Sequence, residues 1–190
     1  FARLQRAIAS HRLPAAPLHA LLDAFTQDVA NPTYADRAAL LGYCARSASP
    51  VGRLLLHLYG IDDEQALQRS DAVCSALQLA NFWQDLGIDA GRGRHYVPLA
   101  DLHRHGLALV DLQPGADSER TRALLRELVG WARTLMLEGA PLVHQLPGRV
   151  GWELRGVVQG GLRVLERIER GGCNALTKRP TIGAADLPLL

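Results

Sequence analysis

Apolar residues recur along this chain with the spacing of a helix. They lie three and four positions apart through most of the sequence, and no segment shows the convincing alternation of a half-buried strand. Prolines and glycines divide the pattern into segments. Helices are predicted over residues 2–12, 17–30, 36–60, 70–91, 99–106, 119–145 and 150–169, the third with a kink at Pro50. The sequence therefore predicts an all-α protein.

The segment 70–91 differs from an ordinary surface helix. Ser70 is a suitable N-cap, and no proline interrupts the segment before Gly91 ends it. Residues spaced i, i+3, i+7 and i+11 form one straight stripe on a helix. In this segment that stripe is polar and comprises Gln78, Asn81, Asp85 and Asp89. Because its neighbours are mostly apolar, we expect a mostly buried helix with a minority polar face.

Two carboxylates four residues apart on such a helix require a cation or a wet cavity, because an unpaired buried charge is costly. Asp85 and Asp89 suit Mg²⁺, which uses one or two carboxylates and completes its shell with water and substrate phosphates. Gln78 and Asn81 would then hydrogen-bond water or substrate oxygens. The alternative interpretation is a solvated face that pairs locally with arginines.

The glycine-rich loop that follows, residues 91–98, carries Arg92, Arg94 and Tyr96. Guanidinium groups suit multidentate recognition of phosphate, and glycines allow a loop to close over a ligand. No nucleotide-binding glycine pattern accompanies these cations, which favours a diphosphate over a nucleotide. A solvated turn is the alternative.

Small residues gather around the predicted kink at Pro50, between Tyr43 and Gly52. They leave room either for a ligand beside the helix or for the close approach of another helix. In the first case Tyr43, Ser47 and residues 50–52 would line a cavity wall. In the second they would be core packing.

Composition excludes several classes of protein. A net charge of +2 over 190 residues is too small to indicate a nucleic-acid partner. No apolar run approaches the roughly 20 residues of a membrane span, and no signal-like start is present. The three cysteines lack metal-like spacing, which favours a reducing cytoplasm. The chain starts at Phe1, directly in helical periodicity, so we expect that an N-terminal part is missing.

Three motifs in order resemble the squalene/phytoene synthase family. They are Tyr43-Cys44-x-x-Ser47-Ala48-x-Pro50-Val51-Gly52, Leu77-Gln78-Leu79-x-Asn81-Phe82-x-Gln84-Asp85-x-x-x-Asp89 and Gly93-Arg94-x-Tyr96-x-Pro98. The resemblance implies one isoprenoid synthase domain over residues 1–190, which is the C-terminal two-thirds of the family domain. Its fold would be an all-α bundle around a central cavity, truncated at the N-terminus.

The resemblance also implies roles for individual residues. In the family, two Asp-rich motifs on facing helices hold Mg²⁺ against a prenyl diphosphate. The implied catalytic residues are Asp85, Asp89, Tyr43 and Arg94, and the implied metal ligands are Asp85, Asp89, Asn81 and Asp28. The implied substrate contacts are Gln78, Asn81, Arg94, Tyr96, Val51, Gly52 and Ser47. The first Asp-rich motif would lie upstream of Phe1, so we expect the chain alone to be inactive.

Two departures from the family pattern favour one branch. Gln84 stands where squalene and phytoene synthases usually have arginine, and Arg53 stands where they tend to have an acidic residue. Both residues are similar to the bacterial hydroxysqualene synthases of hopanoid biosynthesis, which ionise presqualene diphosphate and let water capture the cation without NADPH. Phytoene synthase, squalene synthase and a non-catalytic helical protein are the alternatives. A lipophilic product would favour loose, peripheral membrane contact of a cytoplasmic protein.

Overall fold

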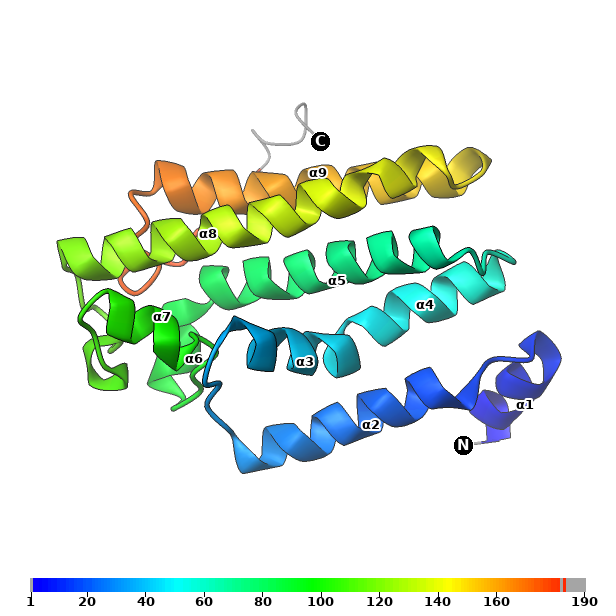
Figure 1. The fold of residues 1–190 in the computed structure, drawn as a ribbon, viewed down its shortest axis with the longest axis horizontal. Helices are drawn as coiled ribbons and strands as arrows, with labels where there is room; N and C mark the ends of the chain where they lie inside the picture. The colour runs from blue at the N-terminus through cyan, green and yellow to red at the C-terminus, as the bar shows by residue number, and fades with distance from the viewer. Residues whose placement is uncertain (1, 182, 184–190) are drawn as a thin grey trace.

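The computed structural model describes residues 2–181 and 183, and every regular element in that part of the chain is helical (Figure 1). The elements are α1 (Ala2–His11), α2 (Ala15–Ala30), α3 (Arg37–Ser47), α4 (Ser49–Leu58), α5 (Glu64–Gln84), α6 (Leu86–Gly91), α7 (Leu99–Arg104), η1 (Leu109–Asp111), α8 (Glu119–Gly139), η2 (Ala140–His144) and α9 (Gly148–Arg170). The prediction of an all-α protein is confirmed.

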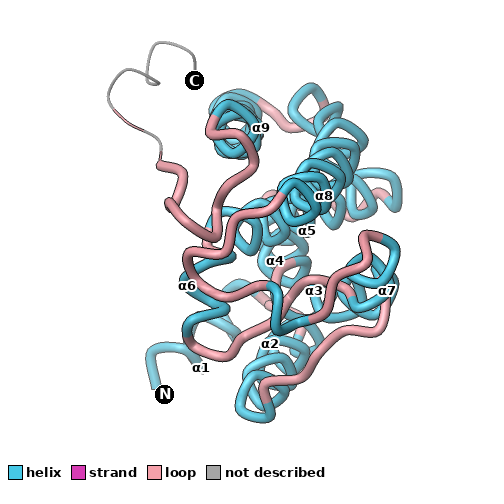
Figure 2. The backbone as a smooth tube through the Cα atoms, turned by 90° about the vertical axis from the view of Figure 1, so that its left-hand side faces the viewer, coloured by secondary structure: helices cyan, strands magenta, loops and turns pink. Residues whose placement is uncertain are grey.

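Helix α5 occupies the middle of the bundle. It packs most extensively against α8 and next against α4, while α9 packs on both α5 and α8, and α2 lies beyond α3 and α4 (Figures 1 and 2). Leu79 and Trp83 of α5 are fully buried, and so are Leu124 and Leu128 of α8. Each such side chain contributes about 1.5–3 kcal/mol when it leaves water. This contact is therefore the main apolar support of α5.

The start of α5 differs from the prediction. Asp63 is its N-cap and accepts a hydrogen bond from the Ala66 N–H at 2.8 Å, so the helix begins at Glu64. Ser70 is a buried residue inside the helix and does not cap it. The earlier cap forms because an aspartate satisfies a free N–H of the first turn as well as a serine does.

The predicted helix 70–91 also bends near its end. Asp85, with φ −96° and ψ 10°, separates α5 from α6. The Asp85 N–H still donates to the Asn81 carbonyl at 2.9 Å, and the Asp89 N–H donates to the Asp85 carbonyl at 2.8 Å. The polar stripe is therefore bent but continuous.

The bend lies beside residues 173–181, which we call the strap. A Cβ on Gly87 would lie 2.8 Å from the Leu176 carbonyl oxygen, so only glycine allows the strap to pass this close to α6. The Gly115 N–H also donates to the Leu176 carbonyl at 2.8 Å. The strap therefore belongs to the packed structure around the end of α5.

Other helix ends can be compared with the predicted ones. The predicted helix 119–145 ends at Gly139 and continues as the 3₁₀ segment η2, in which Pro141 lies in the first turn. The expected interruption before Pro50 is confirmed, because α3 ends at Ser47 and α4 begins at Ser49.

Two further findings concern membrane-spanning helices and the cysteines. None of the helices in the described residues is long and apolar enough to cross a membrane. Cys44, Cys74 and Cys173 are free thiols. Burial raises the pKa of Cys44 to about 12, so this thiol stays protonated and packs as an apolar side chain.

A buried ion-pair cluster fixes α7 to α3 and α8. Asp101 is 1% exposed and accepts hydrogen bonds from the Arg37 Nε at 3.1 and 3.2 Å, and it also pairs with Arg104. Arg37 reaches Glu127 at 2.5 Å and lies 4.9 Å from the centre of the Trp131 ring. Because α7 directly follows the glycine-rich loop, this cluster sets where that loop ends.

We expect Asp101→Ala to lower the free energy of unfolding by about 3 kcal/mol, because two arginines lose a buried counter-ion. Asp62→Ala, on the exposed segment before α5, is the control and should change it by less than about 0.5 kcal/mol. Urea unfolding followed by circular dichroism measures both values. Equal effects of the two substitutions would show that the cluster does not hold α7.

Candidate functional site

The polar stripe lies on the face of α5 that is not covered by α8. Asn81 is exposed, while Gln78, Asp85 and Asp89 are partly exposed. Their apolar neighbours Phe82, Trp83 and Leu86 are buried. The expectation of a mostly buried helix with a minority polar face is confirmed.

An apolar cavity of about 310 Å³ opens on the same face of α5, nearer its start. It lies between α4, α5, η2 and α9, and Ser70, Cys74 and Leu77 line it from α5. Asn81 follows Cys74 by seven residues and therefore lies on the same side of the helix. A hydrocarbon surface and an acidic surface thus adjoin each other along one helix face.

The two open alternatives for residues 50–52 both hold. Val51, 49% exposed, and Gly52 line the apolar cavity. Gly52 also packs closely on α5, because a Cβ there would lie 2.7 Å from the Cys74 sulfur. Close packing of α4 on α5 is what forms this wall of the cavity.

Tyr43 and Asp28 join α3 to α2 beside the site. The Tyr43 hydroxyl donates to an Asp28 carboxylate oxygen at 2.7 Å. Burial, together with this carboxylate, raises the pKa of Tyr43 well above its usual range, so the phenol stays protonated. One turn later, the buried Ser47 hydroxyl has no hydrogen-bond partner within the described chain. Tyr43 and Ser47 therefore place hydroxyl groups in a largely apolar interior, but neither residue lines the apolar cavity between α4 and α5.

Aromatic stacking holds the glycine-rich loop against the bundle. The Tyr96 ring stacks on Phe82 with centroids 3.8 Å apart and an interplanar angle of 7°. Its centroid is 6.1 Å from that of Tyr43. The Asn31 side chain donates to the Gly93 carbonyl at 2.6 Å. Arg94, between these two attachments, is therefore held near the acidic stripe while its side chain remains exposed.

The charged groups that act on Asp89 also show that the loop lies close to the acidic stripe. Burial and the negative charge of Asp85 raise the pKa of Asp89, whereas Arg94 and Arg92 lower it. Burial raises the pKa of Tyr96, and the charges of Asp28 and Asp89 raise it further. The structure thus brings Asp28, Asp89, Arg94 and Tyr96 within electrostatic reach of one another.

The partner of Asp85 in this structure was not predicted from the sequence. Arg179 of the strap forms an ion pair with the Asp85 carboxylate, 94 residues away in the chain. The neighbouring Gln84 side chain donates to the Pro180 carbonyl at 2.7 Å. The only sequence signal was the basic pair Lys178–Arg179, which has no periodicity that could place it.

The residues of the stripe fit a hard divalent cation. Asp85 and Asp89 supply carboxylate oxygens and Asn81 an amide oxygen, the donors that Mg²⁺ takes. Burial and the charge of Asp85 raise the pKa of Asp89, and a bound cation would offset both effects. Within the described chain, however, no three His, Cys, Asp or Glu residues form a ready-made metal site. The ligand set of Asp85, Asp89, Asn81 and Asp28 stays a prediction, with phosphate oxygens needed to complete the shell.

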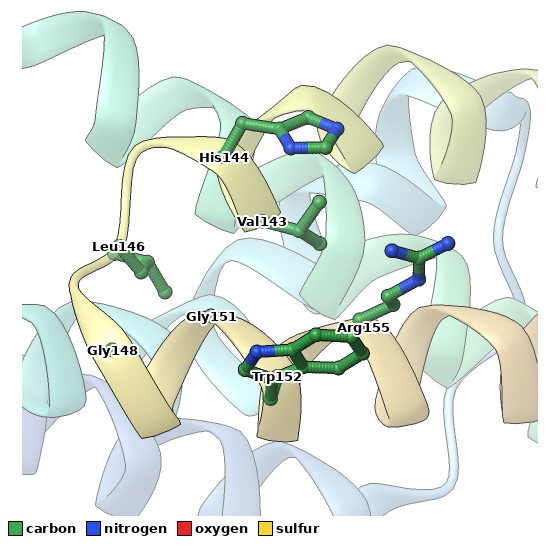
Figure 3. Close-up of a pocket in the computed structure, with 7 residues that line it drawn as sticks. All are labelled: Val143, His144, Leu146, Gly148, Gly151, Trp152 and Arg155. Carbon is green, nitrogen blue, oxygen red and sulfur yellow. The ribbon is translucent and has the colours of Figure 1, made fainter.

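A second cavity, also of about 310 Å³, lies between η2 and the start of α9, at the end of the bundle away from α6 (Figures 1 and 3). His144, Trp152 and Arg155 line it, and none of its lining residues is acidic. It includes no residue of the polar stripe. We therefore place the candidate site at the stripe and its adjoining apolar cavity.

Comparison with known proteins shows which family the chain resembles. The sequence profile described as squalene/phytoene synthase matches residues 1–186. The chain is 33% identical to a phytoene synthase of Thermus thermophilus over 169 residues, 88% of this chain and 57% of that protein. It is 36% identical to a hydroxysqualene synthase of Rhodopseudomonas palustris over 155 residues, 80% of this chain and 52% of that protein.

Solved structures give the same fold. The structure of squalene synthase HpnC from Alicyclobacillus acidocaldarius is 38% identical, with a TM-score of 0.86 over 90% of this chain and 65% of that one. A dehydrosqualene synthase in complex with ligand shares the fold at a TM-score of 0.85, with 21% identity over 94% of this chain and 63% of that one. The isoprenoid synthase fold is confirmed. The chain spans about half the length of the curated relatives described above.

The raised pKa of Asp89 predicts a pH-dependent cost in stability when no metal is present. A carboxyl group whose folded pKa is raised loses stability as the pH rises from its unfolded pKa, near 3.8, through the folded pKa. We expect Asp89→Asn, in EDTA, to be more stable than the parent at pH 7 and no more stable below that window. Urea unfolding between pH 3.5 and 7 measures the difference, and Asp62→Asn is the control. If the stability advantage of Asp89→Asn over the parent decreased as the pH rises, this result would contradict a raised pKa of Asp89.

Proposed function

The chain belongs to the squalene/phytoene synthase family, and from this premise we propose that it serves the Mg²⁺-dependent ionisation of presqualene diphosphate. The C–O bond to the diphosphate breaks, and the leaving group keeps the electron pair. Water then captures the carbocation and loses a proton, which gives hydroxysqualene and diphosphate without NADPH. The place of this reaction would be hopanoid biosynthesis.

The observation that carries the proposal is the division of one face of α5. Toward its start, Ser70, Cys74 and Leu77 line an apolar cavity that suits the hydrocarbon. Beyond its end, Asp85 at the bend and Asp89 on α6 form an acidic surface that suits a cation-bound diphosphate. A prenyl diphosphate has these two parts in the same order, so it can lie along the helix with each part on matching chemistry.

Each residue has a distinct task in this mechanism. Asp85 and Asp89 would hold Mg²⁺, which supplies neutralisation of the charge that grows on the leaving diphosphate. Arg94 would donate charge-assisted hydrogen bonds to the oxygens of the leaving diphosphate. Tyr43, held protonated beside Asp28, keeps a neutral hydroxyl next to the Tyr96 ring of the loop. The apolar cavity limits access of water to the carbocation.

The choice of branch depends on two residues. Gln84, in place of the usual arginine, hydrogen-bonds the strap, and Arg53, in place of an acidic residue, reaches Asp71 at 2.5 Å. Sequence identity alone does not separate the branches, because the chain resembles a phytoene synthase and a hydroxysqualene synthase almost equally. Phytoene synthesis from two geranylgeranyl diphosphates is therefore the second candidate.

The test uses a fusion, because the chain spans about half of its relatives. Residues 1–190 are placed behind the N-terminal segment of the Rhodopseudomonas palustris hydroxysqualene synthase that precedes the similar region. The fusion is assayed with Mg²⁺ and presqualene diphosphate, and then with geranylgeranyl diphosphate. We expect hydroxysqualene from the first substrate, no phytoene from the second, and no activity from the chain alone.

In the fusion we expect Asp85→Asn to reduce diphosphate release by at least about a hundredfold, because it removes stabilisation of the leaving-group charge. Asp62→Asn is the matched control and should keep full activity. Circular dichroism verifies that each variant is folded. Unchanged release from a folded Asp85→Asn variant would refute the assignment, and phytoene as the product would favour the second candidate.

A further inference from the structure

A third cavity, larger than the two described above, lies outside the α5 face. It measures about 530 Å³ and lies between the last turns of α9 and the strap. In Figure 1 the chain leaves the end of α9 and passes the end of α5, where Gln84 and Asp85 hold the strap. The cavity therefore shares the strap with the candidate site.

The lining of this cavity is strongly basic. Arg167 and Arg170 contribute from α9, Lys178 and Arg179 from the strap, and none of the lining residues is acidic. Asn174, Thr177 and Thr181 add polar groups. Four cationic side chains on one cavity, with hydroxyl and amide groups between them, are suited to a small polyanion.

The ion pairing of Arg170 and Lys178 does not prevent such a ligand from binding. Arg170 pairs with Glu166 at 2.5 Å, but both side chains are partly exposed, and exposed pairs contribute little. Lys178 forms no ion pair within the described residues. A ligand with several negative charges can therefore bind Arg170 and Lys178 without breaking a buried ion pair.

We propose that this cavity is a metal-independent binding site for inorganic diphosphate, the leaving group of the proposed reaction. The inference rests on the proposed function for the identity of the anion. Diphosphate carries several negative charges and presents many acceptor oxygens, which match the forked donors of the arginines. The site would receive diphosphate after it leaves the acidic stripe.

Arg179 couples the two sites. Its guanidinium pairs with Asp85, and the residue also lines the basic cavity. Diphosphate in the cavity competes with Asp85 for this guanidinium, and release of Asp85 makes its carboxylate available to a cation. By linkage, a cation on Asp85 favours diphosphate in the cavity by the same factor.

In the test, the purified chain is titrated with inorganic diphosphate in EDTA, and binding is measured by isothermal titration calorimetry. We expect one site, and we expect Arg170→Gln with Lys178→Gln to weaken binding at least about tenfold through the loss of two charge-assisted contacts. Arg149→Gln with Arg155→Gln, which removes the same charge from the opposite end of α9, is the matched control and should bind as the parent does.

Three results would overturn the proposal: no binding in EDTA, equal weakening by the control pair, or equally tight binding of sulfate at the same ionic strength. Arg92→Gln removes a cation that acts on Asp89 of the acidic stripe, and it should leave metal-free binding in the cavity unchanged. Loss of binding in that variant would place the anion at the stripe and refute the second site. Failure of the product assay alone would leave these titrations unaffected, so the two proposals are tested separately.

Discussion

The burial of Asp89 beside the negative charge of Asp85 is the constraint on which the candidate site depends. Burial and this neighbouring charge raise the pKa of Asp89, and two carboxylates at one bent helix end are stabilised where cations face them. Arg179 approaches Asp85 from the strap, while Arg92 and Arg94 act on Asp89 from the loop. The cations thus come from two segments that follow different helices and converge on one helix end.

The surrounding packing explains how these segments reach that end. Gly87 lets the strap pass close to α6, and the Phe82–Tyr96 stack holds the loop beside α5. The buried Asp101 cluster then fixes α7, where the loop ends. Residues whose contribution is structural therefore set the electrostatics of the candidate site. At the other end of the same face, close packing of Gly52 on α5 shapes the apolar cavity.

Local patterns in the sequence were sufficient to predict the helices, the polar stripe and the loop of Arg94 and Tyr96, because helical periodicity and motif spacing are local properties. They were not sufficient for the bend at Asp85, which lies beside a segment about 90 residues later in the chain. The cap at Asp63 was missed because Ser70 satisfied the same local rule. The Arg179–Asp85 pair depends on tertiary contact between an irregular strap and a helix, and no periodic signal encodes such a contact.

The central claim is that the acidic stripe of α5 binds a divalent cation together with diphosphate. The most direct measurement is a crystal structure of the chain grown with Mn²⁺ and inorganic diphosphate, with anomalous data collected at the manganese edge. The account predicts an anomalous peak bridged by the carboxylates of Asp85 and Asp89, with Arg179 released from Asp85. Manganese bound elsewhere, with the Arg179–Asp85 pair intact, would contradict it.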